Sequence, residues 1–413
     1  MIEGRLIVCV ASSWDYDPTS KHQIMRILAE RNDVVWVNYH GSRRPDVSRA
    51  DLRSAWSAIR RISKGVRRVT SSMIQVTPLV IPGAARPLMQ KLHRRMLVAQ
   101  IRRAIRSIDP DRKKPLQVWS FAPDVPYLQG AFNEECFIYY CVDDYTQFEG
   151  FDAERIRSAE NETIERADVV VTTSDQLLAT RSVRRPDTVL VRHGVDFDHF
   201  ARAWRQTLEL PTDIAEIPRP IFGYFGLIHH WVDQDLLSKV ARARPYYSFV
   251  IIGDCQVDVS ALRRIPNVML LGRRDYEHLP AYCAAFDAGL LLFNRTEMTK
   301  SVNPIKMYEY LAAGLPVIST SIPEALRYLG PIRFADTPDE FACACDDVLA
   351  DFSDRRRETI SRTVQSETWR SRVDALSEIV MGHVNGSPRT LPRSGVERSS
   401  STGPIALPAT AIG

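Results

Sequence analysis

The sequence predicts an α/β protein that contains two Rossmann-like domains, each a doubly wound parallel sheet. Two observations predict this class. Strand-like apolar runs alternate with helical patterns along both halves of the chain, and this alternation is typical of parallel sheets with helices on both faces. The chain has 413 residues, more than one ordinary domain, and 45% of them are apolar, which is enough for two cores.

The expected strands are short runs rich in Val, Ile and aromatic residues. In the N-terminal half they cover residues 6–11, 34–39, 73–81, 116–121, 136–142, 169–174 and 188–193. In the C-terminal half they cover residues 220–225, 247–253, 267–272, 288–293, 316–320 and 332–336. Helical patterns such as residues 233–243 and 275–286 separate the strands.

These elements suggest where the domains begin and end. We expect an N-terminal domain over residues 1–200 and a C-terminal domain over residues 221–383, joined by a polar, proline-containing linker over residues 201–220. Residues 384–413 have no periodicity and are rich in Ser, Pro and Gly, which predicts a disordered tail.

The composition disfavours membrane-spanning and secreted proteins. No apolar run approaches the roughly 18 residues that a membrane span needs, and the apolar stretch at residues 6–11 is too short for a signal peptide. The seven cysteines, an odd number with scattered spacing, favour reduced thiols and a cytoplasmic protein. Cys343 and Cys345 lie close together on an expected helix without partner ligands, so we expect no metal site.

Positive charge is concentrated between Arg43 and Lys114. This segment holds 19 Lys and Arg against four acids, a net charge of +15, and the rest of the chain carries −11 because the whole carries +4. Such asymmetry indicates an anionic partner, either a membrane surface or nucleic acid. The segment contains one aromatic residue, Trp56, so it lacks the stacking aromatics of single-strand binders. We therefore expect no nucleic acid as a partner and favour the membrane.

Within this segment, residues 88–108 have the spacing of an amphipathic helix with one apolar and one strongly basic face. The basic face could simply be solvated. Alternatively, it could rest on anionic lipid headgroups, which would place the protein peripherally on the inner face of the cytoplasmic membrane.

The stretch NPIKMYEYLAAGLPVIST, residues 303–320, carries an unusual lysine. Asn303 suits the N-cap of a helix and Pro304 its first position, so Lys306 falls near the positive end of the helix dipole. A cation there is unfavourable unless an anion shares the site. Glu309 lies one turn further on, and an ordinary surface pair between Lys306 and Glu309 is the alternative to a bound anion.

Neither half carries the glycine-rich turn of a dinucleotide-binding or Walker-type protein. The turn after the first N-terminal strand reads ASSWDYDPTSKHQ, and the corresponding C-terminal turn, GYFGLIHHWVDQD, contains only Gly223 and Gly226. A dinucleotide oxidoreductase and a nucleoside triphosphatase are therefore disfavoured.

Four successive C-terminal motifs read GYFG, VIIGD, NVMLLGRRDYEHLPAYCAAFDAGLLLF and NPIKMYEYLAAGLPVIST. Upstream stand AENETIERADVVVTTSDQLLATR and HGVDFDHF, in which His193 occupies the usual place of an asparagine. In this order the motifs resemble the GT-B glycosyltransferases, most closely the retaining enzymes of family 4, also called glycosyl transferases group 1. The resemblance spans residues 5–383 and implies the GT-B fold, in which the two Rossmann-like domains face a cleft.

The resemblance implies that the C-terminal domain binds a nucleotide-sugar donor. Glu309 matches the second glutamate of the family's paired-glutamate motif, which binds the donor ribose. The segment from Asn303 to Lys306 would cradle the diphosphate, and Lys306 would neutralise it. The candidate donor-binding residues are Gly226, Arg273, Asn303, Pro304, Ile305, Lys306 and Glu309.

Two positions depart from the family pattern. The first glutamate of the pair is Ser301 here, and the usual Arg and Lys after the first C-terminal strand are replaced by GLIHHW. Lys306, with His229 or His230, would then supply more of the charge compensation, or the leaving group differs.

The N-terminal domain would hold the acceptor. CFIYYCVDDY ends a strand with Asp143 and Asp144 where the family often has a His-Asp pair, so these are the candidate catalytic residues. Adjacent residues on a strand point in opposite directions, so one of the two would face the cleft. Trp14, Asp15 and His22, in the first N-terminal turn, are candidate acceptor-binding residues.

The sequence thus predicts a metal-independent glycosyltransferase of the hexosyltransferase type that needs no cofactor beyond its nucleotide-diphosphate sugar donor. Its acceptor would be a glycan or a polyprenyl-linked sugar in the synthesis of cell-surface polysaccharide or glycolipid. Two alternatives stay open: a nonhydrolysing nucleotide-sugar epimerase, which shares this architecture, and a noncatalytic GT-B binding module.

Overall fold

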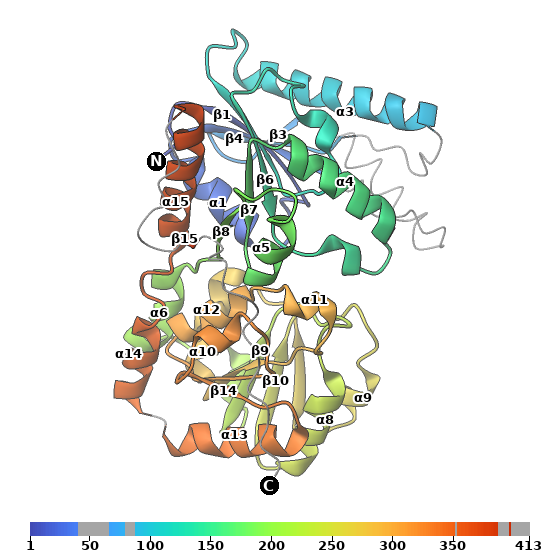
Figure 1. Ribbon diagram of the computed structural model, residues 1–413. Coiled ribbons are helices and arrows are strands. Elements are labelled where there is room, and N and C mark those ends of the chain that lie inside the picture. Colours follow the sequence, from blue (N-terminus) through green and yellow to red (C-terminus); the bar gives the residue numbers. More distant parts are fainter. Residues whose placement is uncertain (40–65, 79–86, 352, 387–395, 398–413) are drawn as a thin grey trace.

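The structure is a computed structural model that describes residues 1–39, 66–78, 87–351, 353–386 and 396–397. Two α/β domains, each built around one sheet, lie one above the other in Figure 1. Helices cover both faces of each sheet, as parallel strands require when they are buried on both sides.

The N-terminal sheet has the strand order β15-β8-β7-β6-β5-β1-β2-β4-β3. Its strands are β1 (Leu6–Ala11), β2 (Asp33–Asn38), β3 (Val66–Arg68), β4 (Met73–Val76), β5 (Leu116–Ser120), β6 (Cys136–Cys141), β7 (Val169–Thr172), β8 (Val189–Val191) and β15 (Val396–Glu397). All neighbours are parallel except the two edge strands, β3 and β15, which run antiparallel. Its helices are α1 (Ser20–Leu28), α3 (Pro87–Ile108), α4 (Ala153–Arg166) and α5 (Asp175–Arg181).

The C-terminal sheet is parallel throughout, with the strand order β11-β10-β9-β12-β13-β14. Its strands are β9 (Ile221–Phe225), β10 (Ser248–Ile252), β11 (Val268–Gly272), β12 (Ala288–Leu291), β13 (Val317–Ser319) and β14 (Ile332–Phe334). Its helices are α8 (Gln234–Ala243), α9 (Ser260–Arg263), α10 (Leu279–Ala285), α11 (Glu297–Lys300), α12 (Ile305–Ala312), α13 (Pro338–Ala350) and α14 (Asp354–Arg362).

The expected linker over residues 201–220 is not an open connection, so this expectation is corrected. Helix α6 (Phe197–Arg205) runs into it, and the short helix α7 (Thr212–Ala215) lies within it. The apolar side chains of α6 recur at helical spacing, and they join Ile214 in the core of the C-terminal domain. Within α6, the polar residues that suggested a linker lie on the face opposite the buried apolar side chains.

The chain crosses between the domains twice, and the two crossings run side by side. The Val195 N–H donates to the Glu367 carbonyl at 2.8 Å, and the Trp369 N–H donates to the Val195 carbonyl at 3.2 Å. Gly194 makes this approach possible, because a Cβ there would lie 2.7 Å from the Trp369 nitrogen. After the second crossing, helix α15 (Trp369–Val384) returns to the N-terminal domain and packs on α1 and on β6 to β8.

Most of the expected C-terminal tail lies outside the described residues, and so does much of the basic segment. Within the tail, Val396 and Glu397 form β15 against β8. None of the helices in the described part of the chain combines the length and the apolar character needed to cross a lipid bilayer.

Candidate active site

The helix that carries Lys306 begins at the junction between the domains. Helix α12 starts at Ile305, with Pro304 as the N-cap, so the expectation that Asn303 caps it is wrong. The Asn303 side chain instead donates to the Thr173 carbonyl of the N-terminal domain at 2.8 Å. Ile305 packs against the N-terminal core. No side chain in the described part of the chain caps α12, so its first N–H groups are available to an anion.

Lys306 lies against the turn that follows β9. Its Nζ sits 5.3 Å from the ring centre of Tyr224, and no carboxylate of the described residues is within ion-pair distance of it. Gly226 has φ +127°, and a Cβ there would lie 2.1 Å from the Lys306 Cε. A Cβ on Gly253, after β10, would meet the Gly226 carbonyl at 2.0 Å. The glycines after β9 and β10 therefore make the room in which this lysine side chain lies.

Glu309 is one turn further along α12 and only 7% exposed. Burial raises its pKa to about 8, against the opposing effect of Lys306, while the Asp196 carboxylate raises it further. The carboxyl group is therefore largely neutral at pH 7. It makes no ion pair with Lys306 in the described structure, so the surface-pair interpretation of these two residues does not hold.

Two other residues on the donor side, Ser301 and Arg273, bond to other residues of the protein. Ser301, at the position of the family's first glutamate, is 2% exposed, and its hydroxyl donates to the Met298 carbonyl at 2.8 Å. Arg273 reaches across to the N-terminal domain and pairs with Asp17 at 2.7 Å. In this structure Arg273 therefore bridges the two domains, and Ser301 closes the turn of α11.

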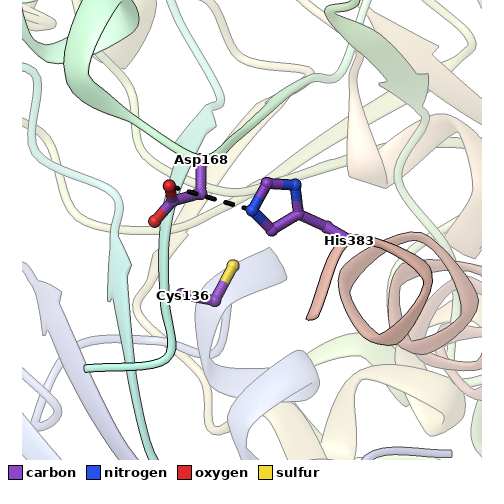
Figure 2. A group of neighbouring side chains, drawn as sticks. All are labelled: Cys136, Asp168 and His383. Atoms are coloured by element: carbon purple, nitrogen blue, oxygen red, sulfur yellow. Dashed lines mark ion pairs between the residues drawn. The ribbon is translucent and has the colours of Figure 1, made fainter. Parts of the chain in front are cut away.

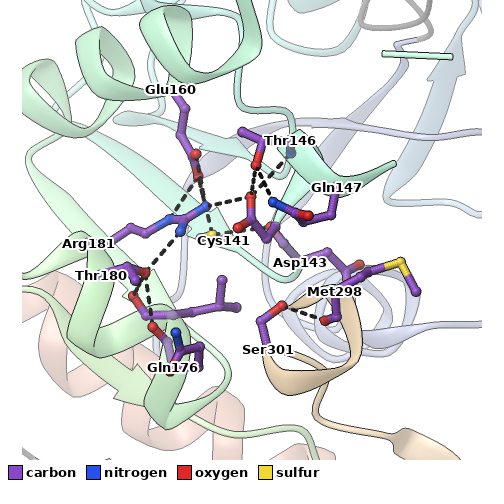
Figure 3. A network of polar contacts seen from close by, with 12 residues as sticks. Cys141, Asp143, Thr146, Gln147, Glu160, Gln176, Thr180, Arg181, Met298 and Ser301 are labelled. Carbon is purple, nitrogen blue, oxygen red and sulfur yellow. Dashed lines mark hydrogen bonds and ion pairs between the residues drawn. The ribbon is translucent and has the colours of Figure 1, made fainter. Parts of the chain in front are cut away.

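On the acceptor side, the structure distinguishes the two adjacent aspartates. Asp144 accepts the Thr146 N–H at 3.2 Å and the Thr146 hydroxyl at 2.7 Å, which caps a short 3₁₀ turn, and it pairs with Arg181 at 3.4 Å. Asp143 has no such partner among the described side chains, and it lies half-buried in the region that Figure 3 draws between the Arg181 network and Ser301. Asp143 is therefore the candidate catalytic carboxylate, and Asp144 shapes the turn.

A buried network holds this turn in place (Figure 3). Arg181, from α5, donates to both oxygens of Glu160, which is 3% exposed, at 3.1 and 3.0 Å. Glu160 also accepts the Tyr139 hydroxyl at 2.7 Å. Because Arg181 contacts both Asp144 and the buried Glu160, it anchors the loop after β6 to the helices α4 and α5.

The sequence reasoning missed Lys21. This half-buried residue occupies the first turn of α1, directly after the N-terminal turn, just as Lys306 does in α12. Burial lowers the pKa of Lys21, and the nearby Asp143 carboxylate opposes that shift. Burial also raises the pKa of Asp143 to about 7, opposed by Lys21. Lys21 shares with Lys306 the position of a cation at the positive end of a helix dipole, and this signal is present in the sequence.

The three acceptor candidates of the first turn have structural partners. His22 is 1% exposed, and its Nδ1 accepts the Thr19 N–H at 3.1 Å, so its role is to cap α1 rather than to face a sugar. The Trp14 ring packs on Trp36 at 4.9 Å. Asp15 pairs with Arg67 at 2.5 Å. Of the three, Trp14 and Asp15 retain exposed surface.

Aromatic side chains from both domains meet at the loop that follows Asp143 in the chain. Phe148 and Phe151, in this loop, have ring centres 6.0 Å apart. Phe148 also lies 6.5 Å from Trp231 of the C-terminal domain, and His229 stacks on Trp231 at 4.4 Å. These rings are half-buried and form what we call the aromatic rim, defined as Phe148, Phe151, His229 and Trp231. Such rings suit the apolar faces of sugars. His230 lies 4.0 Å from Glu149, so the two histidines face the N-terminal domain.

Comparison with known proteins finds similarity to glycosyltransferases. Residues 219–351 match the family model described as glycosyl transferases group 1. A Bacillus subtilis (strain 168) protein, described as the teichuronic acid biosynthesis glycosyltransferase TuaH, is 26% identical over 273 residues, which cover 61% of this chain and 68% of that protein.

Solved structures share the fold over nearly the whole chain. Anabaena HepE in complex with UDP and glucose superimposes with a TM-score of 0.65 and 14% identity, covering 92% of this chain and 100% of that one. Sucrose-phosphate synthase from Thermosynechococcus elongatus superimposes with a TM-score of 0.65 and 16% sequence identity. That match covers 93% of this chain and 100% of the synthase chain. Together, the shared fold and the match over residues 219–351 show that the chain resembles the GT-B glycosyltransferases, with a C-terminal domain similar to glycosyl transferases group 1.

Proposed function

We propose that the protein transfers a sugar, of the hexose type, from a nucleotide-diphosphate donor to a glycan or lipid-linked acceptor. The observation that carries the proposal is the position of Lys306, an unpaired cation beside the uncapped start of α12 where the two domains meet. A half-buried cation at a helix N-terminus is unfavourable on its own, and a diphosphate would remove that cost.

In this proposal the donor diphosphate is the leaving group. The bond between the sugar C1 and the phosphate oxygen breaks while C1 bonds to the acceptor oxygen. The N–H groups of Ile305 and Lys306, with the Lys306 ammonium, stabilise the charge that develops on the departing diphosphate. These groups supply the compensation that other transferases obtain from a divalent metal, so the proposed reaction needs none.

The acceptor hydroxyl loses its proton to Asp143 in this mechanism. A pKa of about 7 suits a general base that works near neutral pH, because it can both hold and release a proton there. Lys21 favours the ionised form of Asp143 and thereby keeps a usable fraction of the base.

The proposed acceptor is a growing cell-surface polysaccharide or its lipid-linked precursor. Support comes from the relative named for teichuronic acid biosynthesis, and from the aromatic rim at the loop that follows Asp143. Incubation with labelled nucleotide sugars tests the proposal. Transfer to acceptor, or slow donor hydrolysis, supports it; interconversion of donor sugars would indicate the epimerase, and binding without turnover would indicate a noncatalytic module.

Glu309 is proposed to bind the donor ribose. Glu309→Ala should weaken nucleotide binding roughly tenfold through lost hydrogen bonds. Glu309→Gln should bind nearly as well as wild type at pH 7, because burial raises the pKa of Glu309 to about 8 and the native group is then mostly neutral. Calorimetry at pH 7 measures both affinities, and equal affinity in the alanine variant would remove Glu309 from the site.

The raised pKa of Glu309 also predicts a stability difference. A carboxyl group whose pKa is higher in the folded state supports folding fully below its unfolded pKa, and this support is lost as pH rises from the ordinary value of 4.5 to the folded value of about 8. Glu309→Gln should therefore gain melting temperature relative to wild type as pH rises from 5 to 8. A constant difference across that range would show that Glu309 is not buried as described.

The aromatic rim is proposed to hold an acceptor sugar. Trp231→Ala should raise the acceptor KM about tenfold, equivalent to about 1.4 kcal/mol, while donor hydrolysis stays unchanged. Tyr246→Ala, which removes an aromatic residue that is 89% exposed elsewhere on the same domain, is the matched control. Equal acceptor kinetics in the two variants would exclude the rim from acceptor binding.

A peripheral attachment to anionic membrane would bring the enzyme to lipid-linked acceptors. Helix α3 buries Leu97, Ile101 and Ile105 against the N-terminal sheet and exposes a basic face. On that face Arg94 lies over the Tyr127 ring at 4.9 Å, and Arg102 donates to the Ala131 carbonyl at 2.8 Å. Among the arginines of α3, Arg95, Arg103 and Arg106 are exposed and contact no other described side chain through an ion pair or hydrogen bond.

Binding to lipid vesicles tests this attachment. Each basic residue near an anionic leaflet contributes about 1 kcal/mol, screened over about 8 Å at physiological salt. The protein should cosediment with anionic but not neutral vesicles, and less so as salt rises. Changing Arg94, Arg95, Arg102 and Arg103 to Glu should abolish binding. A second variant, with Arg95, Arg103 and Arg106 changed to Glu, should also abolish it. This triple variant keeps Arg94 and Arg102, which make contacts within the protein. Unchanged binding in the triple variant would leave this face as a solvated surface.

A further inference from the structure

Three metal-ligating side chains meet at the edge of the N-terminal sheet that faces away from the C-terminal domain (Figures 1 and 2). Cys136 is the first residue of β6, Asp168 directly precedes β7, and His383 lies in the last turn of α15. One ligand atom from each lies within 4.8 Å of the others. The His383 Nε2 is 3.8 Å from the Asp168 Oδ1.

The chemistry of this set suits a divalent transition metal. A thiolate, an imidazole and a carboxylate are the ligands that Zn²⁺ takes in proteins, whereas Mg²⁺ and Ca²⁺ prefer oxygen ligands alone. In a tetrahedral zinc site the ligand atoms stand about 3.3 to 3.6 Å apart. A contraction of about 1 Å among three side chains, two of them half-exposed, would reach that spacing.

The carboxylate is already oriented for such a role. The Asp168 Oδ2 accepts the Phe137 N–H at 2.7 Å, which fixes the group and turns Oδ1 toward His383 (Figure 2). A hydrogen bond on the far oxygen is the usual support of a metal-bound carboxylate.

We propose that Cys136, Asp168 and His383 form a binding site for a zinc-like divalent ion, with water as the fourth ligand. Binding would release the thiol proton of Cys136 to solvent, and the metal would fasten the end of α15 to the strands on which it packs. The six residues of β6 separate the site from Asp143 by roughly 20 Å, at about 3.3 Å per residue, so the site is structural rather than catalytic. No ligand spacing in the sequence predicts this site, because its three ligands lie on three separate elements.

Cobalt titration tests the proposal. The full-length protein would carry Cys255→Ser and Cys343→Ser, which remove its two exposed thiols. We expect one Co²⁺ per chain, with thiolate-to-cobalt charge-transfer absorption in the near ultraviolet, displaced by Zn²⁺. Zinc should also raise the melting temperature. Cys136→Ser should abolish the charge-transfer band, and His383→Gln should weaken binding at least tenfold.

Matched controls separate the site from adventitious binding. Cys283→Ser removes another buried thiol, in the C-terminal domain, and should leave the band intact. His383 is partly exposed, so His383→Gln should fold even if Cys136→Ser does not, and its metal-free melting temperature checks this. No stoichiometric cobalt binding, or equal affinity in His383→Gln, would show that the three residues form only an ion pair beside a buried cysteine.

Discussion

Lys306→Ala is expected to lower sugar transfer by about two orders of magnitude while leaving the fold intact. A single positioned electrostatic group that stabilises a developing anion contributes about 3 kcal/mol. Without its ligand, Lys306 stands at the positive end of α12, so its removal should leave the melting temperature unchanged or slightly higher. Steady-state transfer rates and thermal melts measure the two effects.

Lys300→Ala is the matched control for that experiment. Lys300 lies on the neighbouring helix α11 and pairs with Glu297 at 2.5 Å on the surface. It should retain wild-type activity. Unchanged activity in Lys306→Ala would return that lysine to the role of an ordinary surface residue and remove the main support for the donor site.

Asp143→Asn is expected to reduce transfer by two to four orders of magnitude, the usual contribution of general acid–base catalysis. In the wild type, activity should rise with pH through about 7, because burial raises the pKa of Asp143 to about 7 and only the ionised carboxylate can take the acceptor proton. The asparagine variant should lose this acidic limb from its pH profile. Donor affinity should not change.

Asp198→Asn, at a carboxylate that is 95% exposed on α6, serves as the control and should keep both rate and pH profile. An Asp143→Asn enzyme that retains both the wild-type rate and the wild-type pH profile would show that another group takes the proton. A variant with a lowered rate but an unchanged profile would assign Asp143 to positioning only.

Much of the fold could be predicted from the sequence because its strands are buried on both faces. Such strands read as continuous apolar runs, and β1, β6, β9 and β10 fall within the predicted ranges. The edge strands of the N-terminal sheet were harder to predict. Val66 to Arg68 are all exposed and form β3 only because β4 offers an unpaired edge. Residues 201–205, the second half of α6, fall within the predicted linker because polar residues predominate in that stretch.

Residues of the candidate site could be predicted where their charge is unfavourable in the helix that carries them. A lysine at a helix N-terminus is such a residue, and Lys306 was found in this way, whereas Lys21 was overlooked although it occupies the same position in its helix. The roles of Asn303 and Arg273 could not be foreseen, because their partners Thr173 and Asp17 lie more than a hundred residues away in the other domain. The sequence also could not distinguish Asp143 from Asp144. The difference arises because Arg181, from the distant helix α5, pairs with Asp144.

The most direct test of the donor site is a crystal structure of the protein with UDP. The proposal predicts that the diphosphate accepts hydrogen bonds from the N–H groups of Ile305 and Lys306 and contacts the Lys306 ammonium, with the ribose hydroxyls on Glu309. A diphosphate bound elsewhere, for example on Arg273 with Lys306 still unliganded, would contradict the account.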